Sequence, residues 1–258
     1  MQIDRRRAQA AFAAYTARYN ASDPKVKLKI DHTYRVAGLC ARIAASEGMP
    51  PADADLAWLC GLLHDVGRFE QLRRYGTFND AVSIDHADCS ARLLFDQGRI
   101  RDYTDDDSQD ALLRAAVALH SAYRLPDSLD GRTLLYCNIL RDADKIDILR
   151  VNVETPLEEI YNVSTRELRS AAVTPEVEAA FYGHHAVLRT LKRTPADNVV
   201  GHMSLVYELV FAESLRIMRE QGWLEKLMDF STGNPDTARR FSAMREHLRG
   251  WLDARLQG

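Results

Sequence analysis

The chain has 258 residues, of which 46% are hydrophobic, so it can bury the core of one large domain or of two small ones. Its formal net charge is only −3 and its basic residues are scattered among acidic ones, which argues against a nucleic-acid surface. No window approaches the roughly 20 apolar residues of a membrane span, and the N-terminus has no convincing export pattern. We therefore expect a cytoplasmic protein that binds neither nucleic acid nor membrane.

Apolar residues recur at helical spacing along the whole chain, and no long alternating run predicts a sheet. The expected fold class is therefore all-α. In chain order, the pattern predicts a first helix over residues 5–20, a second over 27–46, and a third that begins at the N-cap Asp53 and is ended by Gly67. A long loop over 68–84 should follow.

The second half of this pattern begins near Asp85, where a fourth helix should run to residue 97 with Gly98 as its C-cap. A fifth helix should end around His120, and a sixth should cover 133–150. Further helices are predicted around 175–191, 198–221 and 235–256. We expect an N-terminal helix (1–24), a core (25–150), and C-terminal helices (151–258) that pack on the core as one compact domain.

The four cysteines are far apart and none forms a CxxC pair. Each lies in an apolar helical context, which favours reduced core thiols over disulfides or a zinc ribbon. The residues concerned are Cys40, Cys60, Cys89 and Cys137.

Four histidines and two aspartates fall on or next to the apolar faces of five predicted helices. His32 precedes Val36 by four residues, and Asp144 lies four residues from both Leu140 and Ile148, so both share a face with core positions. The full set is His32, His64, Asp65, His86, His120 and Asp144.

A hydrogen-bonded core residue is the simpler interpretation of any single inward histidine. Six such groups are harder to explain in that way, because each buried aspartate needs a partner and no inward-facing cation is evident. A shared metal centre would satisfy all of them, since imidazole and carboxylate are good ligands for transition metals. Asp65 could bridge two ions about 3.5–4 Å apart, which would activate a water and bind a phosphoryl oxygen.

The ordered set His32, the doublet His64–Asp65, and Asp144 resembles the H…HD…D signature of the HD superfamily of metal-dependent phosphohydrolases. His86 and His120 extend it to the six-ligand H…HD…H…H…D form, and "HDVGRFEQLRRYGTF" and "RDADKIDIL" resemble a group of bacterial HD proteins. The resemblance covers about residues 25–150 and implies an HD helical bundle to which the C-terminal helices are added.

The resemblance also implies the ligand sets. One metal would be held by His32, His64, Asp65 and Asp144, and a second by Asp65, His86 and His120. His64 and Asp65 would be essential for catalysis. The ions would be one or two divalent transition metals, with iron or manganese favoured and nickel, cobalt, zinc or magnesium also compatible.

At two places the sequence differs from the patterns of known HD subclasses. Ser121 follows His120 where the HD-GYP cyclic-dinucleotide phosphodiesterases have a second histidine, and no GYP follows. Arg68 and Glu70 stand where guanosine-tetraphosphate hydrolases have an acidic pair. Both subclasses are therefore disfavoured.

Two cations are candidates for substrate binding. Arg68 stands where related two-metal enzymes often have a phosphate-binding lysine, and a guanidinium can bind phosphate through two parallel hydrogen bonds. A surface cation at a helix C-terminus is an equally good interpretation of Arg68. Lys145 follows Asp144, but neighbouring helical positions point about 100° apart, so an exposed or indirect role fits nearly as well.

We therefore expect a phosphohydrolase that cleaves a phosphate ester of a nucleotide or other small phosphorylated metabolite with a metal-activated hydroxide. Two alternatives stay open: a di-iron oxygenase with the same six ligands, or a regulatory module that binds metal and a phosphorylated ligand without turnover. The expected partners are the small phosphorylated substrate and a second copy of the chain in a homodimer.

Overall fold

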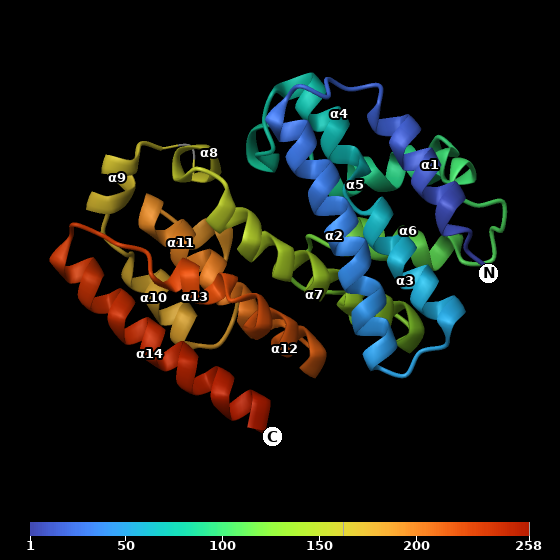
Figure 1. The fold of residues 1–258 in the computed structure, drawn as a ribbon. Helices are drawn as coiled ribbons and strands as arrows, with labels where there is room; N and C mark the ends of the chain where they lie inside the picture. Colours follow the sequence, from blue (N-terminus) through green and yellow to red (C-terminus); the bar gives the residue numbers. More distant parts are fainter. Residues whose placement is uncertain (162, 258) are drawn as a thin grey trace. The chain divides into compact units, whose positions relative to one another are not determined.

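A computed structural model describes residues 1–161 and 163–257 of the chain, and over these residues it is built from helices with no strand (Figure 1). The predicted all-α fold class is confirmed. The α-helices are α1 Arg5–Thr16, α2 Pro24–Ser46, α3 Pro51–Leu63, α4 Val66–Tyr75, α5 His86–Ala91, α6 Asp110–Leu119, α7 Gly131–Glu154, α8 Leu157–Tyr161, α9 Thr165–Ser170, α10 Pro175–Tyr182, α11 Pro195–Met203, α12 Ala212–Gln221, α13 Trp223–Met228 and α14 Pro235–Gln257.

The chain divides into two compact units, Met1–Asp144 and Lys145–Gly258, and α7 runs through the boundary between them. The first unit therefore contains all six residues of the predicted metal centre. Packing of the C-terminal helices on the core as one domain stays a prediction.

In the first unit, α2 and α3 lie side by side along most of their lengths, and α5 packs between α4 and α6 (Figure 1). Aromatic rings join α1 to this group, because Phe12 packs edge-on against Phe69 with ring centroids 6.0 Å apart. Both rings are almost completely buried. Burial of such side chains stabilises the unit by about 1.5–3 kcal/mol each.

The helix starts follow simple capping rules. Asp23 accepts a hydrogen bond from the backbone N–H of Lys25, and Pro24 occupies the first turn of α2, where its missing N–H costs nothing. Asp85 caps α5 in the same way by accepting from Ala87 and Asp88, at the place where the sequence predicted a helix start. α5 therefore begins at His86, a predicted metal ligand.

The predicted end of the third helix at Gly67 is wrong. α3 ends at Leu63, and Gly67 lies inside the next helix, α4, which extends to Tyr75. Gly67 is needed there because a Cβ would lie 2.5 Å from the carbonyl oxygen of His86 and 2.6 Å from the amide nitrogen of Ser90. The true stop is Gly76, whose φ of 67° is left-handed. The loop predicted over 68–84 is correspondingly shorter.

The second unit departs from the predicted helices at two places. The helix expected over 175–191 ends at Tyr182, and the chain turns at His184, whose φ of 59° is left-handed. The helix expected over 198–221 is two helices, α11 and α12, joined by a 3₁₀ turn over Ser204–Glu208. Periodicity alone missed these breaks because the apolar spacing continues across them.

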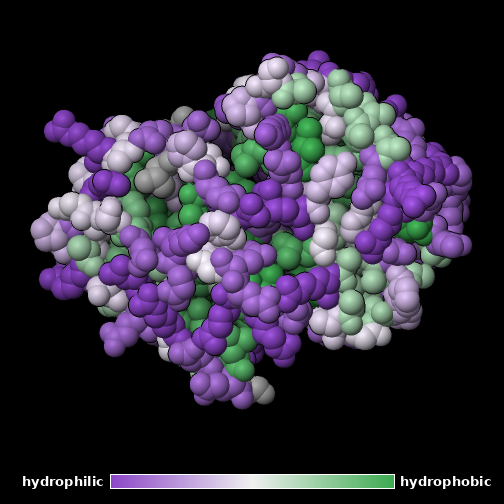
Figure 2. Space-filling model, viewed as in Figure 1, coloured by the Kyte–Doolittle hydropathy of each residue, from purple (hydrophilic) through white to green (hydrophobic). Residues whose placement is uncertain are grey.

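The burial of the cysteines and the polarity of the surface are those expected from the sequence. Three of the four cysteines are buried, Cys89 is half-buried, and all four are free thiols. On the face seen in Figure 2, hydrophilic residues cover most of the surface and apolar residues form small patches between them. Within the described ranges, every helix is too short or too polar to cross a membrane.

Candidate metal centre

The structure brings the six predicted ligand residues together inside the first unit. Most come from helix ends: His64 and His120 are the C-caps of α3 and α6, Asp65 is the N-cap of α4, and His86 opens α5. His32 and Asp144 come from within α2 and α7. Helix ends suit such groups, because the chain can aim a polar side chain there without breaking the helical backbone pairing.

Asp65 lies at the centre and divides the four imidazoles into two pairs. Its Oδ2 lies 3.6 Å from His32 Nε2 and 3.5 Å from His64 Nε2. Its Oδ1 lies 3.6 Å from His86 Nε2 and 3.7 Å from His120 Nε2. Each carboxylate oxygen therefore faces a different pair, which is the arrangement expected of a bridging carboxylate.

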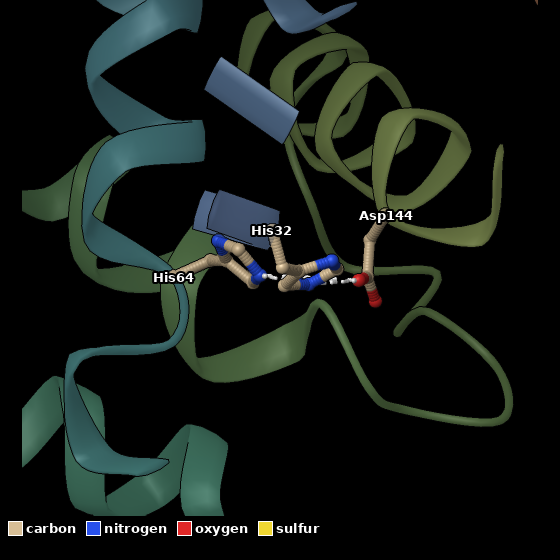
Figure 3. Close-up of side chains that lie close together, drawn as sticks. All are labelled: His32, His64 and Asp144. Atoms are coloured by element: carbon tan, nitrogen blue, oxygen red, sulfur yellow. Dashed lines mark hydrogen bonds and ion pairs between the residues drawn. The ribbon is translucent and has the colours of Figure 1, made fainter. Parts of the chain in front are cut away.

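The first pair is completed by Asp144. Its Oδ1 lies 3.2 Å from His32 Nε2 and 3.8 Å from His64 Nε2, and the two Nε2 atoms are 3.3 Å apart (Figure 3). The donor atoms of these three residues all lie within 4.8 Å of one another. We call His32, His64 and Asp144, together with Oδ2 of Asp65, the first subsite.

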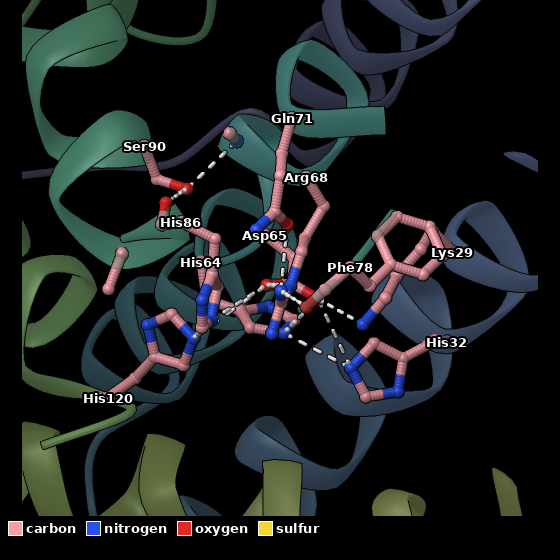
Figure 4. A network of polar contacts seen from close by, with 12 residues as sticks. Lys29, His32, His64, Asp65, Arg68, Gln71, Phe78, His86, Ser90 and His120 are labelled. Atoms are coloured by element: carbon pink, nitrogen blue, oxygen red, sulfur yellow. Dashed lines mark hydrogen bonds and ion pairs between the residues drawn. The ribbon is translucent and has the colours of Figure 1, made fainter. Parts of the chain in front are cut away.

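The second pair lies on the other side of Asp65. His86 Nε2 and His120 Nε2 are 3.0 Å apart, and both rings point at the same place (Figure 4). We call these two histidines, together with Oδ1 of Asp65, the second subsite. It offers two nitrogens and one oxygen, so an ion there would keep positions for water or substrate.

The outer nitrogens of three imidazoles are held by hydrogen bonds. His64 Nδ1 lies 2.7 Å from the carbonyl oxygen of Gly61, and His120 Nδ1 lies 2.7 Å from that of Val117. A carbonyl can only accept, so each Nδ1 donates a proton and leaves a lone pair on Nε2. In His86 the acceptor is a carboxylate oxygen of Asp80, 2.6 Å from Nδ1. All three rings therefore present Nε2 as a ligand atom.

Burial favours the protonation states that metal binding requires. It lowers the pKa of His120 to about 4, and it also lowers the pKa values of His64 and His86. Burial by itself would raise the pKa of Asp65, but the positive charges of Lys29 and Arg68 outweigh it and hold that pKa well below its usual range. Neutral imidazoles and an ionised carboxylate are therefore present together at neutral pH.

The comparison with known families agrees with this geometry. Residues 30–149 match the family model described as HD domain. The chain contains an HD domain. Searches of curated proteins and of solved structures found no match to the chain. The match includes all six residues of the centre and indicates the superfamily of metal-dependent phosphohydrolases.

The donor set of this HD domain fits a pair of divalent ions. Oδ1 of Asp65 is buried and accepts no hydrogen bond, although an unpaired buried carboxylate oxygen costs free energy. Arg68 Nε lies 3.5 Å away without a hydrogen bond, and the next polar atoms, at 3.6 and 3.7 Å, are imidazole nitrogens with lone pairs, which cannot satisfy it. A cation between Oδ1 and these nitrogens would satisfy all three atoms. The assignment of the six residues as metal ligands stays a prediction.

Two cations flank Asp65, the predicted bridging residue. Lys29 Nζ lies 2.7 Å from Oδ2, and Arg68 Nε lies 3.5 Å from Oδ1 (Figure 4). The Phe78 ring lies near both, 5.5 Å from Lys29 Nζ and 5.8 Å from the Arg68 guanidinium carbon. Arg68, which the sequence suggested as a phosphate-binding residue, therefore lies beside the second subsite. It is not a solvent-facing cation.

The other predicted substrate residue, Lys145, follows Asp144 in α7, is partly buried, and is the first residue of the second unit. Its role stays a prediction. Sequence reasoning missed Lys29 and Asp80. Lys29 could have been found, since it precedes His32 by three residues and so shares its helical face. Asp80 lies in a loop, where no periodicity indicates the direction of a side chain.

Proposed function

We propose that this HD domain is a metal-dependent phosphohydrolase that cleaves a phosphate ester of a nucleotide or other small phosphorylated metabolite. The observation that carries the proposal is the position of Asp65 between two imidazole pairs, with one oxygen toward each. Iron or manganese suits these nitrogen and oxygen donors best, and nickel, cobalt, zinc and magnesium are also compatible.

When bound, a metal pair supplies a water nucleophile of lowered pKa and positive charge that offsets charge on the transferring phosphoryl group. The residues of the chain hold and orient the groups that react. Asp65 lies between the two subsites and would hold an ion on each side, and the inward Nε2 lone pairs of the histidines would supply the remaining protein ligands. His64 and Asp65 are therefore the residues on which turnover depends most.

Arg68 supports a phosphorylated substrate in particular. Its Nη1 donates to the carbonyl oxygen of Phe78 at 2.7 Å, which holds the guanidinium in one orientation. Its Nε is buried with no hydrogen-bond partner, on the side of Asp65 Oδ1. A buried donor left in this state is costly unless a ligand accepts from it, and a phosphoryl oxygen is a suitable acceptor. Lys29 adds a second positive charge on the other side of Asp65.

The test is phosphate release from a panel of nucleotides and sugar phosphates by protein loaded separately with Mn²⁺ and Fe²⁺. His64→Ala is the inactive control, and turnover should fall by at least about 10³-fold because a ligand of the first subsite is lost. Normal turnover by clean, metal-replete His64→Ala would overturn the assignment. Tight binding of a phosphorylated ligand without turnover, across several metals, would favour a regulatory module.

One observation favours a second candidate, a di-iron oxygenase. The second subsite consists of two histidines and one carboxylate, a set that also holds non-haem Fe(II) in oxygenases. Oxygen electrode measurements with the iron-loaded protein separate the two chemistries. Oxygen consumption with a candidate substrate, or phosphate release only under air, would favour the oxygenase; equal phosphate release without oxygen would favour the hydrolase.

A further inference from the structure

Asp80 lies in the loop between α4 and α5, and its carboxylate contacts both a residue of the second subsite and the proposed phosphate-binding arginine. Oδ2 lies 2.6 Å from His86 Nδ1. Oδ1 accepts from Arg68 Nη1 and from Gln71 Nε2, both at 2.8 Å. The side chain is only 16% exposed, so these contacts are largely shielded from water.

His86 needs this partner because of its place in the fold. His64 and His120 end their helices, so each finds a carbonyl one turn earlier in its own helix to accept from Nδ1. His86 is the first residue of α5 and has no preceding helical turn. Its orientation and tautomer are therefore set from outside the helix, by the loop carboxylate.

The contacts of Asp80 require a carboxylate and no other side chain of that size. Three donors point at it, and a carboxylate can accept from all three because it has no proton of its own. Gln71 is fully buried and also donates to Ser83 Oγ at 2.8 Å, so it cannot easily turn away. Any replacement that brings its own N–H would place a donor against a donor.

We propose that Asp80 is a positioning residue that keeps the proton of His86 on Nδ1 and holds Arg68 beside it, and so controls the second subsite independently of the first. Its effect on metal and substrate rests on the proposed function, but its effect on His86 does not. A change at Asp80 in the loop would then alter the positions of His86 and Arg68 together. Asp80 itself contributes no ligand atom to either subsite; it acts through His86 and Arg68.

The decisive variant is Asp80→Asn, which has almost the same shape but only one acceptor oxygen. If the oxygen faces His86, the amide N–H groups oppose Arg68 and Gln71; if it faces those two, the amide donates to Nδ1 and drives the proton of His86 onto Nε2. The affinity of the second Mn²⁺ should fall by about 10- to 100-fold, and the first Mn²⁺ should bind as before.

Asp85→Asn is the matched control. Asp85 also precedes His86, but its carboxylate caps α5 by accepting from the amides of Ala87 and Asp88, and asparagine is an equally good N-cap. Its Mn²⁺ stoichiometry and phosphate release should match those of the unaltered protein. The retained first Mn²⁺ in Asp80→Asn serves as an internal check that the domain is folded.

The tautomer is read directly from the ¹⁵N chemical shifts of His86 in metal-free protein. In the unaltered chain Nδ1 should be protonated and Nε2 should not; any other state overturns the proposal without the need for a variant. Binding of two Mn²⁺ with unchanged affinity by Asp80→Asn would also overturn it. If the tautomer shifts and the second Mn²⁺ is lost, but no form of the protein releases phosphate, Asp80 has the proposed role and the phosphohydrolase assignment fails.

Discussion

Lys29 Nζ lies 2.7 Å from Oδ2 of Asp65, one helical turn before the predicted ligand His32. Both side chains are largely buried, at 16% and 3% exposed. An ammonium therefore balances the charge of the carboxylate on which both subsites depend. Loss of Lys29 would leave only the more distant Arg68 guanidinium, 3.5 Å from Oδ1, to balance the charge of Asp65 in a water-poor environment.

Lys29→Met should destabilise metal-free protein by about 2–3 kcal/mol, less than the roughly 3–5 kcal/mol for breaking a fully buried ion pair, because Lys29 is not completely buried. The loss should be smaller with saturating Mn²⁺, since a bound cation would balance Asp65 in its place. Urea unfolding with and without chelator measures both values. Lys27→Met, at an exposed position of the same helix, is the control, and an equal loss in the two variants would contradict the ion-pair argument.

Asp65→Asn and His120→Ala should differ in the number of ions they lose. Asp65 faces both imidazole pairs, whereas His120 faces only the second subsite. Elemental analysis after Mn²⁺ loading should give about two ions for the unaltered chain, about one for His120→Ala and fewer than one for Asp65→Asn. Asp31→Asn, next to His32 but exposed, should retain both ions. A full complement in Asp65→Asn would exclude a bridging role.

Gly67→Ala should lower the free energy of unfolding by about 1–3 kcal/mol, the usual cost of forcing extra volume into a packed region. The new Cβ would meet backbone atoms of His86 and Ser90, which cannot rotate away, so α5 and the predicted ligand His86 must shift. Gly38→Ala is the matched control, since nothing lies within 4 Å of its Cβ and helix propensity predicts a gain of about 1 kcal/mol. Denaturant midpoints of the two variants should move in opposite directions.

The second unit should lose stability in acid because of Asp197. Burial by itself would raise the pKa of this carboxyl, but hydrogen bonds from Thr174 and from the amides of Arg193 and Thr194 outweigh it and lower the pKa. A lowered folded-state pKa gives stability that is complete above the unfolded value, about 3.9, and is lost as pH falls below it toward the folded value.

Asp197→Asn should therefore cost about 2–3 kcal/mol at pH 7, because the variant lacks the charged hydrogen bonds that the unaltered protein makes there. The cost should be smaller below about pH 4, because protonation of Asp197 weakens these bonds in the unaltered protein as well. Thermal unfolding between pH 3 and pH 7 measures the difference. Asp229→Asn, whose side chain is 72% exposed, is the control. Parallel pH profiles for Asp197→Asn and the unaltered chain would show that Asp197 makes no such contribution.

The sequence by itself determined the fold class and which residues are candidates for the centre. Helical periodicity places His32 and Asp144 on apolar faces with no knowledge of the tertiary structure, because side chains four residues apart share a face. The order of His64, Asp65, His86 and His120 along the chain resembles the HD signature, and that resemblance implied a shared site. The helical faces and the order of the residues are both properties of the sequence itself.

The tertiary structure alone decided how those groups are divided and supported. No spacing along the chain shows that Oδ1 of Asp65 faces His86 while Oδ2 faces His32, since this depends on how four helices pack. The continuation of the chain into α4 at Gly67 likewise depends on the approach of α5, and local rules for glycine predicted a stop. Asp80 reaches His86 from a loop, where side-chain direction follows from long-range contacts and not from any repeat.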